Sequence, residues 1–316
     1  MRSAGVDLRK VWAPGLLLVI LALLATLTLY AAGYTVILLT YILMYIVLTM
    51  SWVIFAAPTG YVSLATAAFY GVGMYTSAIL GKQLPLPVVV LIGGLACLCL
   101  ALLVGALTLR LRGIYFAIFT LGLVELIKNL LLWYEVKYTG TRGRFVIVVD
   151  NNTIYHVMFI ILVILLVTAY LIRRSRYGLA LRSIGDNEDA AAHTGVNADA
   201  LKTITFAISA AFMGAAGAIM ATRLTYIDPY FAFDSTFSFM PVLMAIFGGM
   251  GPFLGPALGS AVFGYLREIL LTRFPYYYML GFGIILIVTI LYLPEGLVGL
   301  GQKSWRRISG GQRAHA

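Results

Sequence analysis

The sequence is poor in charge, and this shortage excludes a large soluble domain. Charged residues make up 11% of its 316 residues, whereas a soluble globular domain carries roughly 25%. Residues 11–81 contain no Asp, Glu, Lys or Arg. That stretch alone is long enough for three membrane spans of about 20 residues each. The composition therefore predicts an integral membrane protein.

The residues that usually carry metal, disulfide and nucleotide chemistry are also scarce. The two cysteines, Cys97 and Cys99, share one apolar run, and the three histidines are scattered. This arrangement predicts neither a disulfide framework nor a metal site. The sequence lacks G-x-x-x-x-G-K-[ST], so it does not bind ATP in the P-loop manner. We expect a protein that is not an enzyme and that binds no cofactor itself.

Long apolar runs dominate the chain. Hydrophobic residues account for 62% of it, and the mean hydropathy is +0.98. These runs predict an all-α polytopic membrane protein with a single transmembrane domain, residues 1–316, and about ten transmembrane helices. The expected limits are 13–31, 34–55, 62–80, 86–108, 113–133, 154–172, 203–222, 235–249, 253–272 and 276–293. The run at 235–249 is short, so residues 235–272 form either two full spans or a re-entrant pair of half-helices.

The positions of the basic residues predict how the spans are oriented. The net charge is +10, but its uneven distribution fits a membrane protein better than a nucleic-acid partner. With the amino terminus inside, fourteen of the twenty-two Lys and Arg fall on the inner side, as the positive-inside rule expects. This set consists of Arg2, Arg9, Lys10, Arg110, Arg112, Arg173, Arg174, Arg176, Arg182, Lys202, Lys303, Arg306, Arg307 and Arg313. Both termini and residues 173–202 are then predicted to be cytoplasmic.

Residues 173–202 are a polar segment between two apolar runs and read RRSRYGLALRSIGDNEDAAAHTGVNADALK. Residues 185–187 are expected to separate two short helices, with Asn187 able to cap the second. Residues 188–194 favour a helix with acidic residues in its first turn. Gly195 stands where a helix end requires a left-handed residue. The pattern predicts a surface that docks a soluble partner.

This segment resembles the coupling-loop signature of inner-membrane permeases from binding-protein-dependent ABC importers. The motif G-x-x-x-R-x-x-x-x-N-E-x-A-A-x-x-x-G matches Gly178, Arg182, Asn187, Glu188, Ala190, Ala191 and Gly195. Three further runs, at 60–71, 111–121 and 248–256, are similar to motifs of the branched-chain amino acid permeases. Their order and spacing fit the M-type subunit of that family over about residues 60–300.

The resemblance implies partners as well as a role. An ABC importer permease subunit works with a second homologous permease subunit, two cytoplasmic ATP-binding subunits and a periplasmic substrate-binding protein. ATP and Mg²⁺ would bind the ATP-binding subunits, and the seven matched residues of the 173–202 segment would couple to them. The implied location is the cell inner membrane.

A tentative translocation path follows from small residues and interrupted helices, since irregular backbone at membrane depth is tolerated where it lines a cavity. The alternative is ordinary close helix packing. Glu125 belongs to the candidate path as an ionisable residue within a span, or it lies near the outer interface and reaches toward water. The candidate path residues are Ser63, Phe69, Gly71, Gly73, Tyr115, Phe116, Glu125, Gly248, Gly249 and Gly251.

The family resemblance leaves the substrate open. Branched-chain amino acids are expected from the M-type pattern. However, residues 139–144 read TGTRGR where the family usually carries T-G-G-x-x-G, and permeases for urea, short amides and other amino acids are similar. A secondary transporter is the alternative from another class. It predicts acidic residues within the spans and a dispensable 173–202 segment.

We predict that a cysteine introduced by Ser183→Cys, with Cys97 and Cys99 replaced by Ser, is labelled only from the cytoplasm. The reason is the excess of Lys and Arg on that side. Labelling with a membrane-impermeant thiol reagent, applied to intact cells and to inverted vesicles, measures this. Reaction from the periplasmic side would contradict the predicted orientation.

Overall fold

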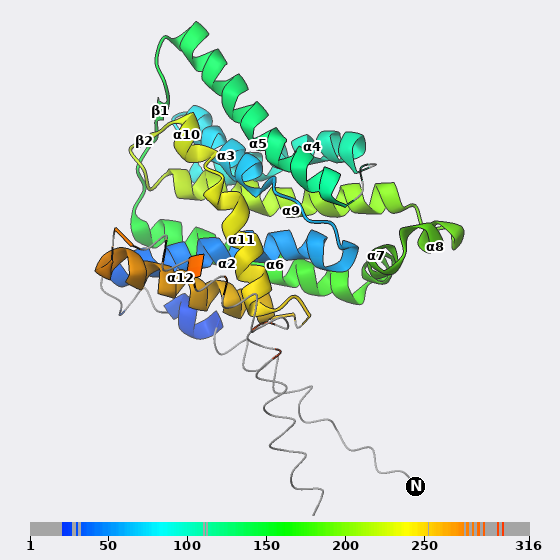
Figure 1. Cartoon of the computed structure of the whole chain (residues 1–316). Helices are drawn as coiled ribbons and strands as arrows, with labels where there is room; N and C mark the ends of the chain where they lie inside the picture. Colours follow the sequence, from blue (N-terminus) through cyan, green and yellow to red (C-terminus); the bar gives the residue numbers. More distant parts are fainter. Residues whose placement is uncertain are drawn as a thin grey trace, which may run out of the picture.

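The computed structural model describes residues 21–26, 30, 33–109, 111, 113–251 and 253–274, and the isolated positions 276–277, 280, 283–284, 287, 296 and 299. Helices form nearly all of the regular structure in this part of the chain (Figure 1). They are α2 (Gly33–Thr59), α3 (Thr66–Leu80), α4 (Leu86–Thr108), α5 (Ile114–Tyr134), the π-helical turn η2 (Glu135–Thr139), α6 (Asn151–Arg174), α7 (Arg176–Asp186), α8 (Glu188–His193), α9 (Ala198–Ala221), α10 (Pro229–Ala232), α11 (Thr236–Gly248) and α12 (Gly255–Arg273).

Six segments among the described residues are long and apolar enough to cross a membrane, so the chain is a polytopic membrane protein. They are Gly33–Thr59, Leu86–Thr108, Ile114–Thr139, Asn151–Arg174, Ala198–Ala221 and Pro229–Gly248. The predicted runs at 62–80 and 253–272 correspond to α3 and α12, which are not among the six segments that qualify by length and hydropathy. The predicted first and tenth spans lie largely outside the described residues. A total of about ten therefore stays a prediction.

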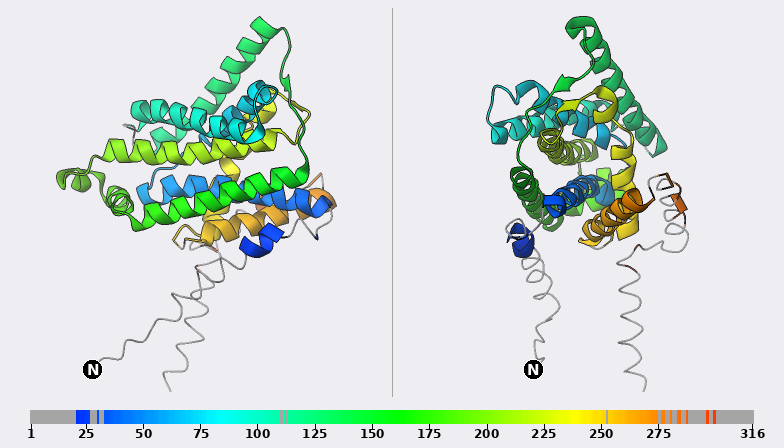
Figure 2. Two further views of the ribbon diagram at one scale, coloured as in Figure 1. Left: turned by 180° about the vertical axis from the view of Figure 1, so that it is seen from behind. Right: turned by 90° about the vertical axis from the view of Figure 1, so that its left-hand side faces the viewer.

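The long helices α2, α4, α6 and α9 run lengthwise through the molecule, while α5 leans away from them (Figures 1 and 2). The short helices α7 and α8 lie at one end. The opposite end carries two short strands, β1 (Arg144–Phe145) and β2 (Tyr226–Ile227), which pair antiparallel. The 173–202 segment and the polar segment after α5 are therefore at opposite ends, as the alternation of predicted spans requires.

A buried carboxylate organises the end that carries the strands. Glu135 is 1% exposed, and its side chain accepts hydrogen bonds from the Gly143 amide at 2.8 Å and from Arg144 Nε at 3.2 Å. The Tyr75 hydroxyl donates to the same carboxylate at 3.5 Å. The charge of Arg144 is therefore paired, whereas the Arg142 side chain is exposed.

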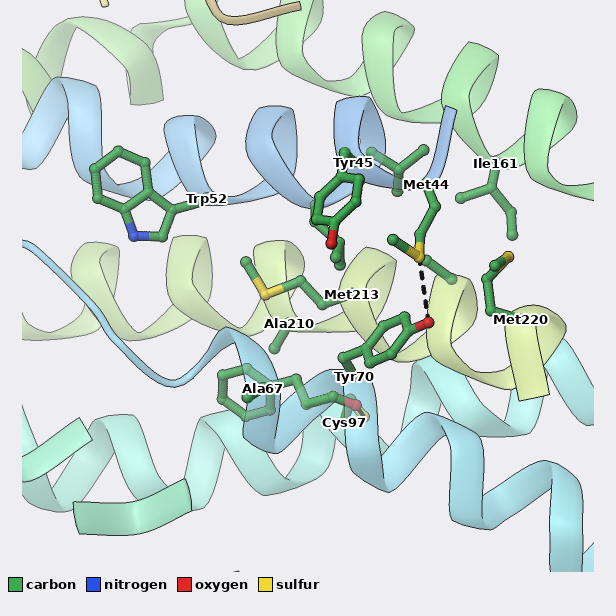
Figure 3. Packing of buried hydrophobic residues seen from close by; sticks show 14 of the residues in the cluster. Met44, Tyr45, Trp52, Ala67, Tyr70, Cys97, Ile161, Ala210, Met213 and Met220 are labelled. Carbon is green, nitrogen blue, oxygen red and sulfur yellow. Dashed lines mark hydrogen bonds between the residues drawn. The ribbon is translucent and has the colours of Figure 1, made fainter. Parts of the chain in front are cut away.

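Helix α9 forms the centre of the packing, because glycines bring its backbone into contact with neighbouring helices. A Cβ at Gly73 of α3 would overlap the Gly214 carbonyl of α9, and one at Gly217 would overlap the Tyr70 carbonyl. Small residues permit such close approach between membrane helices. Figure 3 shows the apolar side chains beside this contact, where the Tyr70 hydroxyl lies 3.2 Å from Met44 Sδ.

We predict that Gly73→Ala destabilises the protein by roughly 1–3 kcal/mol, because the added methyl group overpacks a backbone contact. Gly122→Ala on α5 is the matched control, since a Cβ there meets no atom within 4 Å. That control should be neutral or stabilising, because Ala favours a helix over Gly by about 1 kcal/mol. Thermal unfolding in detergent measures both. Equal stability of the two variants would refute the close-packing explanation.

Candidate functional site

Three side-chain caps divide the 173–202 segment into separate helices. Ser175 Oγ accepts from the Gly178 amide at 3.3 Å and begins α7. Asn187 Oδ1 accepts from the Ala190 amide at 3.0 Å and begins α8. Asn197 Oδ1 accepts from the Ala200 amide at 3.1 Å and begins α9. Such caps satisfy amides that have no partner inside the helix, and the predicted cap at Asn187 is confirmed.

The end of α8 has the geometry expected for Gly195. Its φ is +86°, the left-handed region that favours glycine. The Val196 amide donates to the Ala191 carbonyl at 3.2 Å, and the Gly195 amide donates to the Ala192 carbonyl at 3.0 Å. This pair of hydrogen bonds is a Schellman motif. The predicted left-handed helix end is therefore confirmed, and it turns the chain sharply toward α9.

Close contacts seat α7 on the ends of α6 and α2. A Cβ at Gly178 would overlap the Ile172 carbonyl of α6, and one at Gly185 would overlap the Pro58 carbonyl of α2. Leu181 and Ile184 are buried on the same helix. Gly185 is a helical residue of α7 and lies against α2, and the helix continues through Asp186. The predicted break at 185–187 is wrong in its extent, since Asn187 alone separates the two helices.

A buried lysine joins α8 to the body of the protein. The Lys202 side chain is 1% exposed, and its Nζ lies 2.6 Å from Glu188 Oε1. Nζ also donates to the Leu109 carbonyl at 3.0 Å, just beyond the end of α4. The ammonium lies 4.8 Å from the centre of the Tyr61 ring, a cation–π distance. Asp199 is more distant, at 3.5 Å, and 64% exposed.

Tyr61 completes this group, which we call the Lys202 cluster: Tyr61, Glu188 and Lys202. The Tyr61 hydroxyl donates to Glu188 Oε2 at 2.6 Å, so both carboxylate oxygens of Glu188 are engaged inside the chain. Among the seven matched coupling residues, Arg182, Asn187, Ala190 and Gly195 are exposed, whereas Ala191 and Gly178 are buried. No sequence pattern related Tyr61 to Glu188, because four predicted spans separate the two residues.

Tyr61 lies in a non-helical segment, residues 60–65, between α2 and α3. Side chains from three helices form hydrogen bonds with the backbone of this segment. Trp52 Nε1 of α2 donates to the Ser63 carbonyl at 2.7 Å, and Thr120 Oγ1 of α5 accepts from the Leu64 amide at 2.9 Å. Ser238 Oγ of α11 donates to the Leu64 carbonyl at 2.6 Å. The Lys202 cluster therefore connects α8 to a segment held by α2, α5 and α11.

The candidate path residues do not gather around one described cavity. Gly71, Gly73 and Gly248 occupy helix contacts where a Cβ would overlap a neighbour, and Gly249 (φ +89°) ends α11. Phe69 and Phe116 are buried in an aromatic cluster with Phe206, and Ser63 is buried in the 60–65 segment. Tyr115 is 74% exposed on α5, and Glu125, also exposed there, pairs with Lys128 Nζ at 2.6 Å.

Gly251 is the candidate path residue that lines a described cavity. This cavity, of about 320 Å³, lies between α2, α6, α7 and the turn after α11. Arg173 and Arg182 are at its edge together with the buried Gly178. Arg173 Nη2 donates to the Gly251 carbonyl at 3.3 Å. The cavity therefore adjoins α7 at the same end of the molecule as the Lys202 cluster.

Comparison with known proteins agrees with the family resemblance seen in the sequence motifs. The family model described as "Branched-chain amino acid transport system / permease component" matches residues 34–290. The permease protein LivM of the high-affinity branched-chain amino acid transport system of Salmonella typhimurium is 26% identical over 305 residues, covering 86% of this chain and 71% of LivM. LivM of Escherichia coli is 27% identical, covering 82% and 68%. LivH of Escherichia coli is 29% identical over 131 residues, covering 40% of this chain and 41% of LivH. No solved structure matches.

We predict that Glu188→Gln destabilises the protein more than Lys202→Met does. Removing one partner of a buried pair costs about 3–5 kcal/mol, because the remaining charge stays buried. Glu188→Gln leaves the 1% exposed Lys202 ammonium with only the largely exposed Asp199 carboxylate, 3.5 Å away, whereas Lys202→Met leaves Glu188, which is 16% exposed. The double variant should recover part of the loss. Thermal unfolding of the two single variants and the double variant measures this.

Asp199→Asn is the control for this series, because Asp199 is largely exposed and should contribute less than about 1 kcal/mol. Independent, additive effects of Glu188→Gln and Lys202→Met would show that the two side chains do not act as a pair.

Proposed function

The chain belongs to the branched-chain amino acid transport system permease family, and from that membership we propose that it is the membrane subunit of an ATP-driven importer of branched-chain amino acids. The family match spans most of the described structure, from α2 to beyond α12. Two relatives, matched over 71% and 68% of their own length, are permeases of high-affinity branched-chain amino acid transport systems. Leucine, isoleucine or valine is the proposed cargo.

In this proposal the chain supplies neither the energy nor the first selection of substrate. Two cytoplasmic ATP-binding subunits hold ATP and Mg²⁺, a periplasmic binding protein delivers the amino acid, and a second homologous permease subunit completes the membrane part. The α7–α8 end and both termini face the cytoplasm of a cell with an inner membrane. The inward-facing excess of Lys and Arg supports this orientation.

The observation that carries the coupling role is the buried Lys202 cluster at the base of α8. A connector between spans needs no capped helices and no buried ion pair, whereas a part that passes on movement must be firmly attached. The exposed surface of α7 and α8, with Arg182, Asn187, Ala190 and Gly195, docks the ATP-binding subunits. Glu188 and Lys202 then carry the displacement of α8 to Tyr61 and the 60–65 segment.

Two other functions remain as outcomes of the test. Urea or a short amide is the alternative cargo within the family resemblance, since residues 139–144 depart from the usual glycine-rich pattern. A secondary transporter would use an ion gradient instead of ATP. The firm attachment of α7 and α8 supports the ATP-driven mechanism over this second alternative, because that mechanism requires a mechanical link to a partner.

We predict that proteoliposomes containing the complete importer, with its binding protein outside and ATP inside, accumulate labelled leucine. The physical reason is that closure of the ATP-binding subunits moves α7 and α8. Uptake of radiolabelled leucine and release of phosphate are measured together, with non-hydrolysable ATP as the control. Accumulation of urea without leucine would refute the proposed cargo, and gradient-driven uptake without ATP would refute the importer class.

A further inference from the structure

Two arginines lie against tyrosines near the end of the bundle that carries β1 and β2. The guanidinium carbon of Arg223, which follows α9, is 4.2 Å from the centre of the Tyr41 ring. That of Arg267, on α12, is 5.8 Å from the centre of the Tyr45 ring. Tyr41 and Tyr45 are four residues apart on α2 and so lie on one face of that helix. Three helices therefore bring two cationic side chains to adjacent rings.

Arg223, which follows α9, lacks part of its hydrogen bonding. Arg223 Nη1 is buried and has no hydrogen-bond partner. Buried polar groups are nearly always hydrogen-bonded, and an unmet buried donor costs more than a hydrogen bond gains. A charged group inside a membrane protein usually faces a partner or a substrate pathway. The unpaired Nη1 group is therefore free to donate to a ligand that supplies an acceptor.

The nearby acidic residues do not supply an acceptor for the two arginines. Neither Arg223 nor Arg267 forms an ion pair with a carboxylate of the described residues. Glu268, next to Arg267, accepts a hydrogen bond from the Tyr34 hydroxyl at 3.0 Å. Asp234 Oδ1 accepts from the Thr236 amide at 2.7 Å at the start of α11. The two cations thus form no ion pair within the described structure, which leaves them available to an anionic ligand.

The surroundings indicate which anion fits. Met44, Tyr45, Tyr70 and Met213 lie together between α2, α3 and α9 (Figure 3). A guanidinium binds a carboxylate through paired hydrogen bonds, while thioether and aromatic side chains accommodate an aliphatic group. The combination suits a small carboxylate with an apolar side chain.

We infer that Arg223 and Arg267, supported by Tyr41 and Tyr45, receive the carboxylate of the transported amino acid at the end of the protein opposite α7 and α8. This inference rests on the proposed function and names the chemical group that the permease recognises. Recognition of the carboxylate predicts that an amino acid is accepted and that a neutral amide of the same shape is rejected. Nothing in the coupling role of α8 requires these two arginines.

The test uses the purified importer in nanodiscs without its binding protein, so that binding to the permease itself is measured. Leucine should raise the thermal transition of the wild-type complex, and leucinamide, which lacks the carboxylate, should not. Arg223→Gln and Arg267→Gln should each weaken the leucine response roughly tenfold or more, because each removes charge-assisted hydrogen bonds. Arg223→Lys should retain part of it.

Arg273→Gln is the matched control, since Arg273 is an exposed residue at the end of the same helix as Arg267. Its leucine response should equal that of the wild type. An unchanged leucine response in Arg223→Gln, or an equal response of the wild type to leucinamide, overturns the inference while leucine uptake still supports the proposed function. Uptake of urea alone by the wild type overturns both.

Discussion

The attachment of α8 depends on one buried ammonium group. Lys202 at the start of α9 is almost inaccessible to solvent, and Glu188, Tyr61 and the Leu109 carbonyl surround it. A buried cation is stable only when its partners compensate for the lost hydration. The positions of α8, of the end of α4 and of the 60–65 segment are therefore fixed relative to one another by a single electrostatic requirement.

The 60–65 segment meets a second requirement, which the membrane imposes. Backbone amides and carbonyls without helical partners are costly where water is excluded. Trp52, Thr120 and Ser238 supply the missing hydrogen bonds from three different helices. A displacement of this segment must therefore break or carry along contacts to α2, α5 and α11. The segment thus forms a continuous series of contacts from the α7–α8 end into the helix bundle.

The glycines have two distinct uses in this structure. Gly73, Gly217 and Gly248 remove side chains where helix backbones touch, so their role is packing. Gly195 instead adopts a positive φ that lets α8 end and the chain turn. The same residue type in the sequence thus supports helix association in one place and a helix end in another. Only the surrounding contacts distinguish the two uses.

The sequence by itself determined the membrane class, the positions of most long helices and the two ends of α8. Apolar runs and caps are local, so the patterns that predict α4, α6 and the caps at Asn187 and Gly195 are contained in a few consecutive residues. The motifs also identified the family, because their order along the chain is itself a sequence property.

Tertiary structure alone decided which residues meet. Tyr61 lies 127 residues before Glu188, and no periodicity relates it to Glu188 or Lys202, so their contact depends on how the 60–65 segment, α8 and α9 pack. The same holds for Arg223 and Arg267, which reach neighbouring rings of α2 from the turn after α9 and from α12. The candidate path glycines could not be told from packing glycines, because a glycine has no side chain whose chemistry marks its use. Long-range packing, unlike a local pattern, depends on the whole chain.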